Sequence, residues 1–218
     1  MENTVQNNFR INSFCWINSD QACKDVFIKM LKTDDSNISE LCSMYFEKFY
    51  ILHKIGHIIM HKYDEKHHIQ EARTEYCANL FAYKYLEFKG EKEYLRILFT
   101  VIQNILTINK AYFDFDIDKM NGLFSRYKMD FLTYVAYHFN CFNSCISNKH
   151  EFSEVIKCMS KGKLNHINNG VYLQKGLSGT ELINECLVTV FELNDDLPII
   201  ELNYCSNLNV GNLNLEVW

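Results

Sequence analysis

The sequence is poor in the residues that interrupt helices. Of its 218 residues, one is proline (Pro198) and eight are glycine. Proline breaks helices because its ring removes a backbone hydrogen bond and clashes with the preceding turn, so the long stretch before Pro198 lacks the strongest breaker. Apolar residues recur there mostly at helical spacing, which predicts a mainly helical body.

The sequence also shows no excess of positive charge, no long apolar run and no leader-peptide pattern. The 22 Lys and Arg residues are outnumbered by 27 Asp and Glu residues, which gives a net charge of -5, so we expect no direct nucleic-acid partner. The most apolar segment, 95–108, is interrupted by polar residues and falls short of the roughly 18 to 20 apolar residues that span a membrane. The opening residues show no basic start followed by an apolar stretch. We therefore expect a cytoplasmic protein without membrane contact.

Paired cysteines are absent as well. The nine cysteines are scattered and none forms a CxxC pair, so the usual structural zinc patterns do not fit them. In a reducing compartment such cysteines are mostly small buried apolar residues. An apolar content of 48% is enough for one sizeable core. No repeat or linker marks a boundary, and we expect a single domain over residues 1–218.

Helices are expected over most of the chain and short strands after them, so the predicted fold class is α+β. Ser19 is a capping residue for a helix that runs to Leu31, and Gly90 ends another. The segment from residue 186 onward is rich in apolar residues around turn-like positions, which predicts a hairpin over 186–204 and a further strand after residue 208. The predicted helices cover about 19–31, 37–63, 68–88, 91–109, 119–142 and 151–160, and the strands lie at about 186–218.

The segment HKIGH, residues 53–57, is one letter away from the zinc-peptidase pattern HExxH. Residues four apart on a helix lie about 40° apart around its axis, so His53 and His57 share one face of the predicted helix over 37–63. Gly56 costs about 1 kcal/mol relative to alanine inside a helix. Its presence predicts that another part of the protein approaches the helix closely at this point.

The next predicted helix supplies a carboxylate, Glu75, followed one turn later by Asn79. Two antiparallel helices joined by a short turn would bring Glu75 opposite the histidine pair. Two histidines and one glutamate form the protein ligands of many catalytic zinc sites, with water in the fourth position. We expect Asn79 beside this site, hydrogen-bonded to a ligand or to the adjacent backbone, because ligands need supporting contacts to hold their orientation.

The segments FYILHKIGHIIMH (49–61) and EYCANLFAYKYL (75–86) resemble the ImmA/IrrE metallopeptidases, whose hallmark is an HExGHxxLH helix followed by an ExxANxFA helix. The resemblance implies a zincin-like fold and zinc ligands at His53, His57 and Glu75. It also implies a role in cleaving or engaging a regulatory protein or peptide, often a repressor in mobile genetic elements. The positions that fall on the second motif are Ala78, Asn79, Phe81 and Ala82.

Lys54 occupies the position of the catalytic glutamate. In an active member of the family that glutamate accepts a proton from zinc-bound water. A protonated lysine cannot accept one, and its charge repels a nearby dication by several kcal/mol at an effective dielectric of about 20. We therefore expect a degenerate peptidase that engages its partner without cleaving it.

Three alternatives stay open. An active zinc endopeptidase could use another base, from Asp64, Glu65, Glu71 or a neutralised Lys54. Zinc could be bound without any hydrolytic role. The chain could also be a helical interaction module without metal, which binds a partner by strand pairing. The remaining histidines have no partner at ligand spacing and are expected at the surface or as ordinary core residues: His67, His68, His138 and His166.

Overall fold

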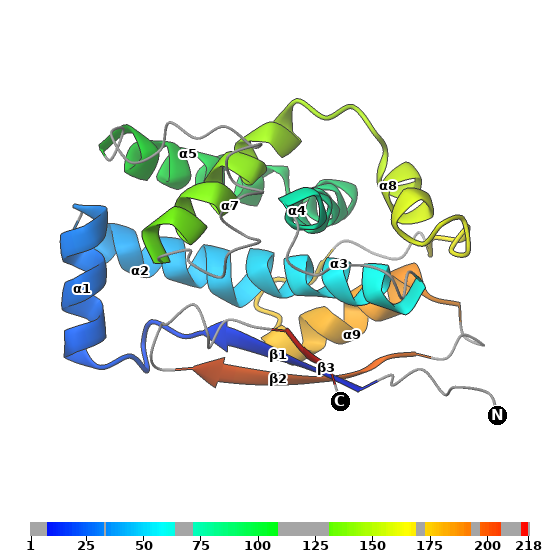
Figure 1. The fold of residues 1–218 in the computed structure, drawn as a ribbon, viewed down its shortest axis with the longest axis horizontal. Helices are drawn as coiled ribbons and strands as arrows, with labels where there is room; N and C mark the ends of the chain where they lie inside the picture. Colours follow the sequence, from blue (N-terminus) through cyan, green and yellow to red (C-terminus); the bar gives the residue numbers. More distant parts are fainter. Residues whose placement is uncertain are drawn as a thin grey trace.

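The structure is a computed structural model that describes residues 8–32, 34–63, 72–108, 131–168, 173–192, 197–205 and 215–217. It is an α+β protein, with a small sheet on one side of a mainly helical body (Figure 1). In the part of the chain that is described, no helix combines the length and the apolar character needed to cross a membrane.

A long helical run passes through the centre of the molecule. It consists of α2 (Asp35–Met44), the π-helical turn η1 (Tyr45–Phe49) and α3 (Tyr50–Tyr63). The backbone stays in the right-handed helical region where these segments join. The helix predicted over 37–63 is therefore present, although it begins two residues earlier and its spacing gave no sign of the π turn.

Contacts outside the helix hold the start and the π turn of this run. The Asp34 side chain accepts a hydrogen bond of 2.8 Å from the backbone N–H of Asn37, which caps α2. The hydroxyl of Ser13 donates a hydrogen bond of 2.6 Å to the carbonyl oxygen of Phe46. That carbonyl lies in the π turn, and π turns occur frequently at functional sites. Ser13 thus connects the sheet to the turn that precedes α3.

The sheet has β1 (Asn8–Phe14) in its centre. β2 (Ile199–Cys205) pairs with β1 in parallel and β3 (Leu215–Val217) pairs with it in the antiparallel sense. Phe9, Ile11 and Phe14 of β1 are buried in the core, whereas Arg10 forms an exposed ion pair with its register partner Glu201. The sheet therefore covers one side of the central helices with a single apolar face.

The strand predicted over residues 186–193 is wrong. Residues up to 190 belong to α9 (Gly179–Val190), a helix that starts with a capping box between Ser178 and Glu181. Leu187 and Val190 of the apolar run lie on the buried face of this helix, whereas Val188 is exposed. The predicted hairpin is wrong as well, because β2 pairs with β1. The strand expected after residue 208 is present in part as β3, and residues 206–214 lie outside the described ranges.

The other helices occur close to the predicted positions. Their bounds are α1 (Gln21–Leu31), α4 (Ala72–Phe88), α5 (Lys92–Ile108), α7 (Phe131–Ile146) and α8 (Phe152–Met159). Gly90 adopts a φ of 80° just after α4, as expected of a glycine that ends a helix. Residues 68–71 and 119–130, which were also predicted to be helical, lie outside the described ranges.

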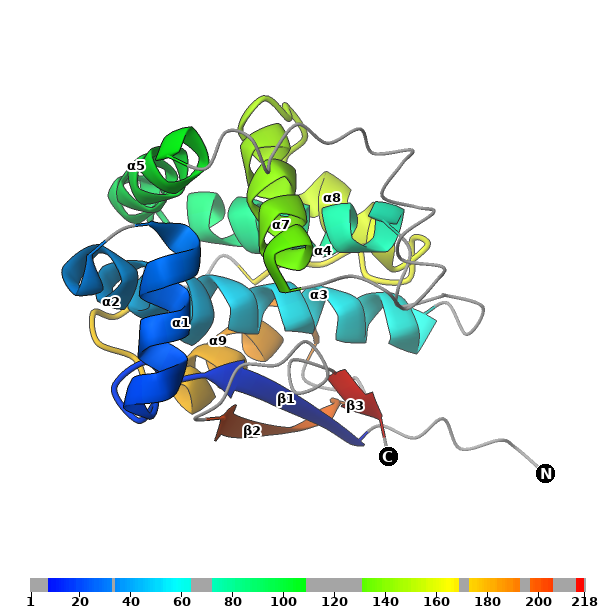
Figure 2. The same ribbon diagram turned by 60° about the vertical axis from the view of Figure 1, so that its left-hand side comes forward.

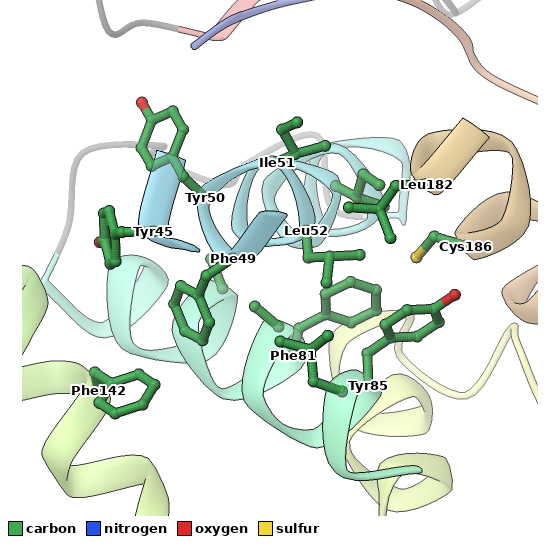
Figure 3. Packing of buried hydrophobic residues seen from close by; sticks show 14 of the residues in the cluster. Tyr45, Phe49, Tyr50, Ile51, Leu52, Phe81, Tyr85, Phe142, Leu182 and Cys186 are labelled. Atoms are coloured by element: carbon green, nitrogen blue, oxygen red, sulfur yellow. The ribbon is translucent and has the colours of Figure 1, made fainter. Parts of the chain in front are cut away.

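α3 is buried on all sides. The sheet and α9 pack on one side of it, α4 packs on the other, and α7 crosses over α4 (Figure 2). Apolar side chains fill the space between these helices, with Phe81 and Tyr85 of α4 near Leu52, and Leu182 and Cys186 reaching in from α9 (Figure 3). Every residue from Tyr50 to Met60 is buried. Polar side chains on α3 therefore have to find partners inside the protein.

Candidate metal centre

Two histidines of α3 meet inside the protein. His53 and His57 are both 0% exposed, and their Nε2 atoms lie 3.1 Å apart. A hydrogen bond at that distance requires a proton on one Nε2 atom and a lone pair on the other. The two Nε2 atoms therefore cannot both be protonated in such a bond.

Gly56 allows α4 to approach this part of α3. A Cβ atom at Gly56 would lie 3.1 Å from the Cα atom of Ala78 and 3.2 Å from the Cβ atom of Phe81. A side chain there would press on the backbone of α4 and push the helices apart. The close approach predicted from Gly56 is thus an approach of α4, one turn beyond Glu75.

Glu75 points at the histidine pair. Its Oε2 atom lies 3.2 Å from Nε2 of His53 and 3.3 Å from Nε2 of His57, and the residue is 5% exposed. The structure therefore brings together the three residues that the sequence singled out as metal ligands. Their role as ligands stays a prediction.

A fourth residue, His138 of α7, joins this group. Its Nε2 atom lies 3.4 Å from Oε2 of Glu75, and the residue is 1% exposed. Ligand atoms of His53, Glu75 and His138 all lie within 4.8 Å of one another. The sequence gave no sign of this, because His138 has no histidine or carboxylate at ligand spacing, and only the packing of α7 on α4 places it here.

The spacing of the His53, His57 and Glu75 atoms fits three corners of a tetrahedral metal site. With zinc bonds of about 2.0–2.1 Å, neighbouring ligand atoms lie about 3.3 Å apart, and these three atoms lie 3.1, 3.2 and 3.3 Å from one another. The Nε2 atom of His138 lies 3.4 Å from the Glu75 oxygen. Oε2 of Glu75 is buried and has no hydrogen-bond partner among the described residues, although three imidazoles surround it. Such a buried, acceptor-rich centre is costly unless a cation or protons fill it.

The protonation states suit a cation. Burial lowers the pKa of His53 well below its ordinary value. Burial also lowers the pKa of His138 to about 4, against the pull of Glu75 and with smaller contributions from Lys54 and His57. Burial alone would raise the pKa of Glu75, but the neighbouring imidazoles outweigh it and hold that pKa well below the usual range. At neutral pH His53 and His138 are therefore neutral imidazoles beside an ionised Glu75 carboxylate, the forms of these side chains that bind zinc.

Lys54 is buried beside this group. It is 4% exposed, and its Nζ atom lies 4.9 Å from the centre of the Tyr50 ring. The Tyr50 ring in turn stacks on the His53 ring, with 5.6 Å between centroids. Among the residues that the structure describes, no carboxylate lies within ion-pair distance of the Lys54 ammonium.

Asn79 lies on α4, one turn after Glu75. Its Nδ2 atom donates a hydrogen bond of 2.8 Å to the backbone oxygen of Glu75 and lies 3.4 Å from Nδ1 of His138. The residue is 0% exposed. It therefore contacts one predicted ligand and the additional histidine at once, which is the position that a supporting residue needs.

The other candidate residues do not join the group or are not described. His166 is at the surface, where Nε2 lies 3.1 Å from the side-chain oxygen of Asn168. The alternative bases Asp64, Glu65 and Glu71 lie outside the described residues, as do His67 and His68.

Comparisons with known proteins found no match for this chain. No protein-family model, no curated protein and no solved structure matches the chain. The function therefore has to be argued from the centre itself.

Proposed function

We propose that this chain is an ImmA/IrrE-like protein of zincin-like fold that binds zinc through His53, His57 and Glu75 and engages a regulatory protein or peptide in the cytoplasm without cleaving it. The observation that carries the zinc part is the convergence of the two Nε2 atoms on one Glu75 oxygen, at 3.2 and 3.3 Å. Three such atoms with tetrahedral spacing form a site that zinc fits.

The donor set favours zinc over harder cations. Imidazole nitrogen is a common zinc ligand, whereas calcium and magnesium prefer sites built entirely from oxygen. A zinc ion in a site with an open coordination position polarises a carbonyl or activates a water. Whether that chemistry is available depends on the residues around the metal.

Lys54 is the reason for proposing a protein without peptidase activity. Peptide hydrolysis needs an acceptor for the proton of the attacking water, and the position that supplies it in the HExxH pattern carries an ammonium group here. The Lys54 Nζ atom lies 4.9 Å from the centre of the Tyr50 ring, within the range of a cation–π contact. A charged Lys54 donates protons to nearby groups and accepts none.

The partner part of the proposal rests on the resemblance of the two motifs and on the sheet. β2 lies at one end of the strand order β2-β1-β3, and its residues Ile199 and Tyr204 are 68% and 41% exposed. An edge strand with exposed apolar side chains is a surface to which an extended peptide can add as a further strand. This supports a protein or peptide as the partner.

The zinc content of the purified protein tests the proposal. We expect one zinc per chain by elemental analysis after dialysis, a loss of that zinc in His57→Ala, and no loss in the control His150→Ala. His150 is an exposed histidine whose Nδ1 atom lies 3.3 Å from Glu154, so its removal tests for adventitious metal. Metal-free protein would favour the interaction module without metal instead.

Proteolysis assays test the proposal that the protein does not cleave its partner. The unaltered protein should leave denatured casein and candidate regulatory proteins intact, with and without added zinc. Cleavage that a chelator abolishes would instead support the active zinc endopeptidase.

A further inference from the structure

His138 reaches the metal centre from a third helix. His53 and His57 come from α3, Glu75 comes from α4, and His138 comes from α7, which packs on α4 (Figure 2). The Nε2 atom of His138 is as close to the Glu75 oxygen as the other two imidazoles are, within 0.2 Å. Its ring also contacts the His53 ring, with 5.0 Å between centroids, so His138 adds a third imidazole to the atoms around the Glu75 oxygen.

We infer that His138 is a fourth protein ligand that closes the zinc coordination shell and joins α3, α4 and α7 through the metal. This inference rests on the proposed zinc binding by His53, His57 and Glu75. It assigns the centre to the closed, structural type of zinc site, in which four side chains hold the metal and no position is left for water.

The number and type of donor atoms support four-coordination. Three imidazoles and one carboxylate provide four ligand atoms, which is the usual number for a structural zinc site, whereas catalytic sites keep three protein ligands and one water. All four side chains are at most 6% exposed. Because they are this deeply buried, a water at the fourth position would have to be trapped in the interior.

The surroundings of His138 also suit a ligand. Metal ligands are held in orientation by contacts with neighbouring residues. The Asn79 side chain lies 3.4 Å from Nδ1 of His138, and its Nδ2 atom donates a hydrogen bond of 2.8 Å to the backbone oxygen of Glu75. Asn79 therefore contacts two of the four proposed ligands.

The competing role for His138 is a hydrogen-bond donor to Glu75. In that case zinc would keep three protein ligands and one exchangeable water. The two arrangements differ in a property that can be measured without any catalytic activity, namely whether the metal accepts a small ligand from solution.

Cobalt(II) substitution distinguishes them in the full-length protein. The absorption bands of cobalt(II) report its coordination, and we expect a four-coordinate spectrum that does not change when azide or imidazole is added. In His138→Ala the fourth position opens, so the same ligands should shift the bands. A spectrum of the unaltered protein that responds to azide and imidazole would overturn the inference, and this result needs no variant.

Zinc affinity supplies an independent readout. Loss of a single supporting residue typically costs 10- to 100-fold in metal affinity, so loss of a ligand in His138→Ala should weaken zinc binding by about 100-fold or more. Imidazole should recover part of that loss, because it can enter the cavity left by the ring. His138→Gln keeps more of the side-chain volume and should also bind zinc more weakly, while the surface control His150→Ala should match the unaltered protein.

The outcomes separate this inference from the proposed function. Unchanged zinc affinity in both His138 variants, with folding verified by circular dichroism, would show that three ligands suffice and would overturn the fourth ligand alone. A failure of the unaltered protein to bind zinc or cobalt would overturn both proposals together.

Discussion

The ammonium group of Lys54 lies 4.9 Å from the centre of the Tyr50 ring, while that ring stacks on His53. A cation is thus held by an aromatic side chain at the border of a centre made of imidazoles and a carboxylate. Lys54 also lowers the pKa of His138, after the larger effect of burial. The charge of Lys54 therefore acts on the centre, although it is not part of it.

Reversing this charge should strengthen zinc binding. Lys54→Glu replaces repulsion between two cations by attraction, a change on the order of a few kcal/mol at an effective dielectric of about 20. We expect at least about tenfold tighter zinc binding, measured by competition with a chelator. Lys54→Met removes the charge without reversing it and should give a smaller gain. Equal zinc affinity in all three forms would show that the charge is screened from the metal.

Restoring peptidase activity should take two changes. Lys54→Glu supplies a proton acceptor, and His138→Ala opens a position for water, so neither change alone provides both requirements of a zinc peptidase. We expect chelator-sensitive cleavage of denatured casein in the double variant only. Equal cleavage by Lys54→Glu alone would show that the fourth position is already open.

A larger residue at Gly56 should weaken both the fold and the centre. The Cα atom of Ala78 would be 3.1 Å from a Cβ atom at this position, and overpacking of a core typically costs about 1–3 kcal/mol. Gly56→Val should lower the free energy of unfolding by that amount and weaken zinc binding, because α4 carries Glu75. The control Thr100→Val, at an exposed position of α5, should change unfolding in urea by less than about 0.5 kcal/mol.

The hydrogen bond between Ser13 and the π turn should contribute measurably to stability. Ser13→Ala leaves the buried carbonyl of Phe46 without the donor that lies 2.6 Å from it, and an unsatisfied buried group costs about 1–3 kcal/mol. Ser144 offers a matched control, since its exposed hydroxyl donates to the carbonyl of Asn140 at 3.0 Å. Ser144→Ala should be nearly neutral in urea denaturation. Equal effects of the two substitutions would contradict the assigned importance of the contact.

Stability should fall at alkaline pH because of Cys141. Burial raises the pKa of this thiol from its ordinary value of 9.0 to about 12. Below pH 9 the Cys141 thiol is protonated in both the folded and the unfolded chain. As the pH rises from 9 to 12, the unfolded chain loses the proton while the folded chain keeps it, so stability decreases by up to about 4 kcal/mol. Cys141→Ala should make this fall smaller without abolishing it, because burial also raises the pKa of the Cys145 and Cys186 thiols. The exposed Cys158→Ala should leave the profile unchanged.

Local patterns in the sequence predict most of the described helices and place His53, His57 and Glu75 near one another. His53 and His57 lie on one face because four residues make about one helical turn, and Gly56 marked the approach of another element. Glu75 could be placed opposite them because α4 follows α3 in the chain. These features depend on spacing within one helix or between neighbouring helices.

The features that the sequence did not predict depend on contacts between distant segments. β1 shows no strong strand pattern, and its place in the sheet comes from pairing with β2, whose register partners are 191 positions away in the sequence. The last residues of α9 fall in the segment 186–193, whose apolar run predicts a strand because a buried helix and a buried strand can share the same pattern. His138 is near Glu75 only because α7 packs on α4, and no local spacing encodes that.

The pairing of β1 with β2 also sets an order for folding during synthesis. Strand β1 is made first, but its parallel partner is added only after the helical segments have been translated. Closing so long a loop carries an entropic cost that has to be offset by the contacts formed afterwards. Until then Phe9, Ile11 and Phe14 lack the sheet that places them against the helices. The nascent chain therefore has to hold these apolar side chains against α3, or rely on a chaperone, until residues 199–205 leave the ribosome.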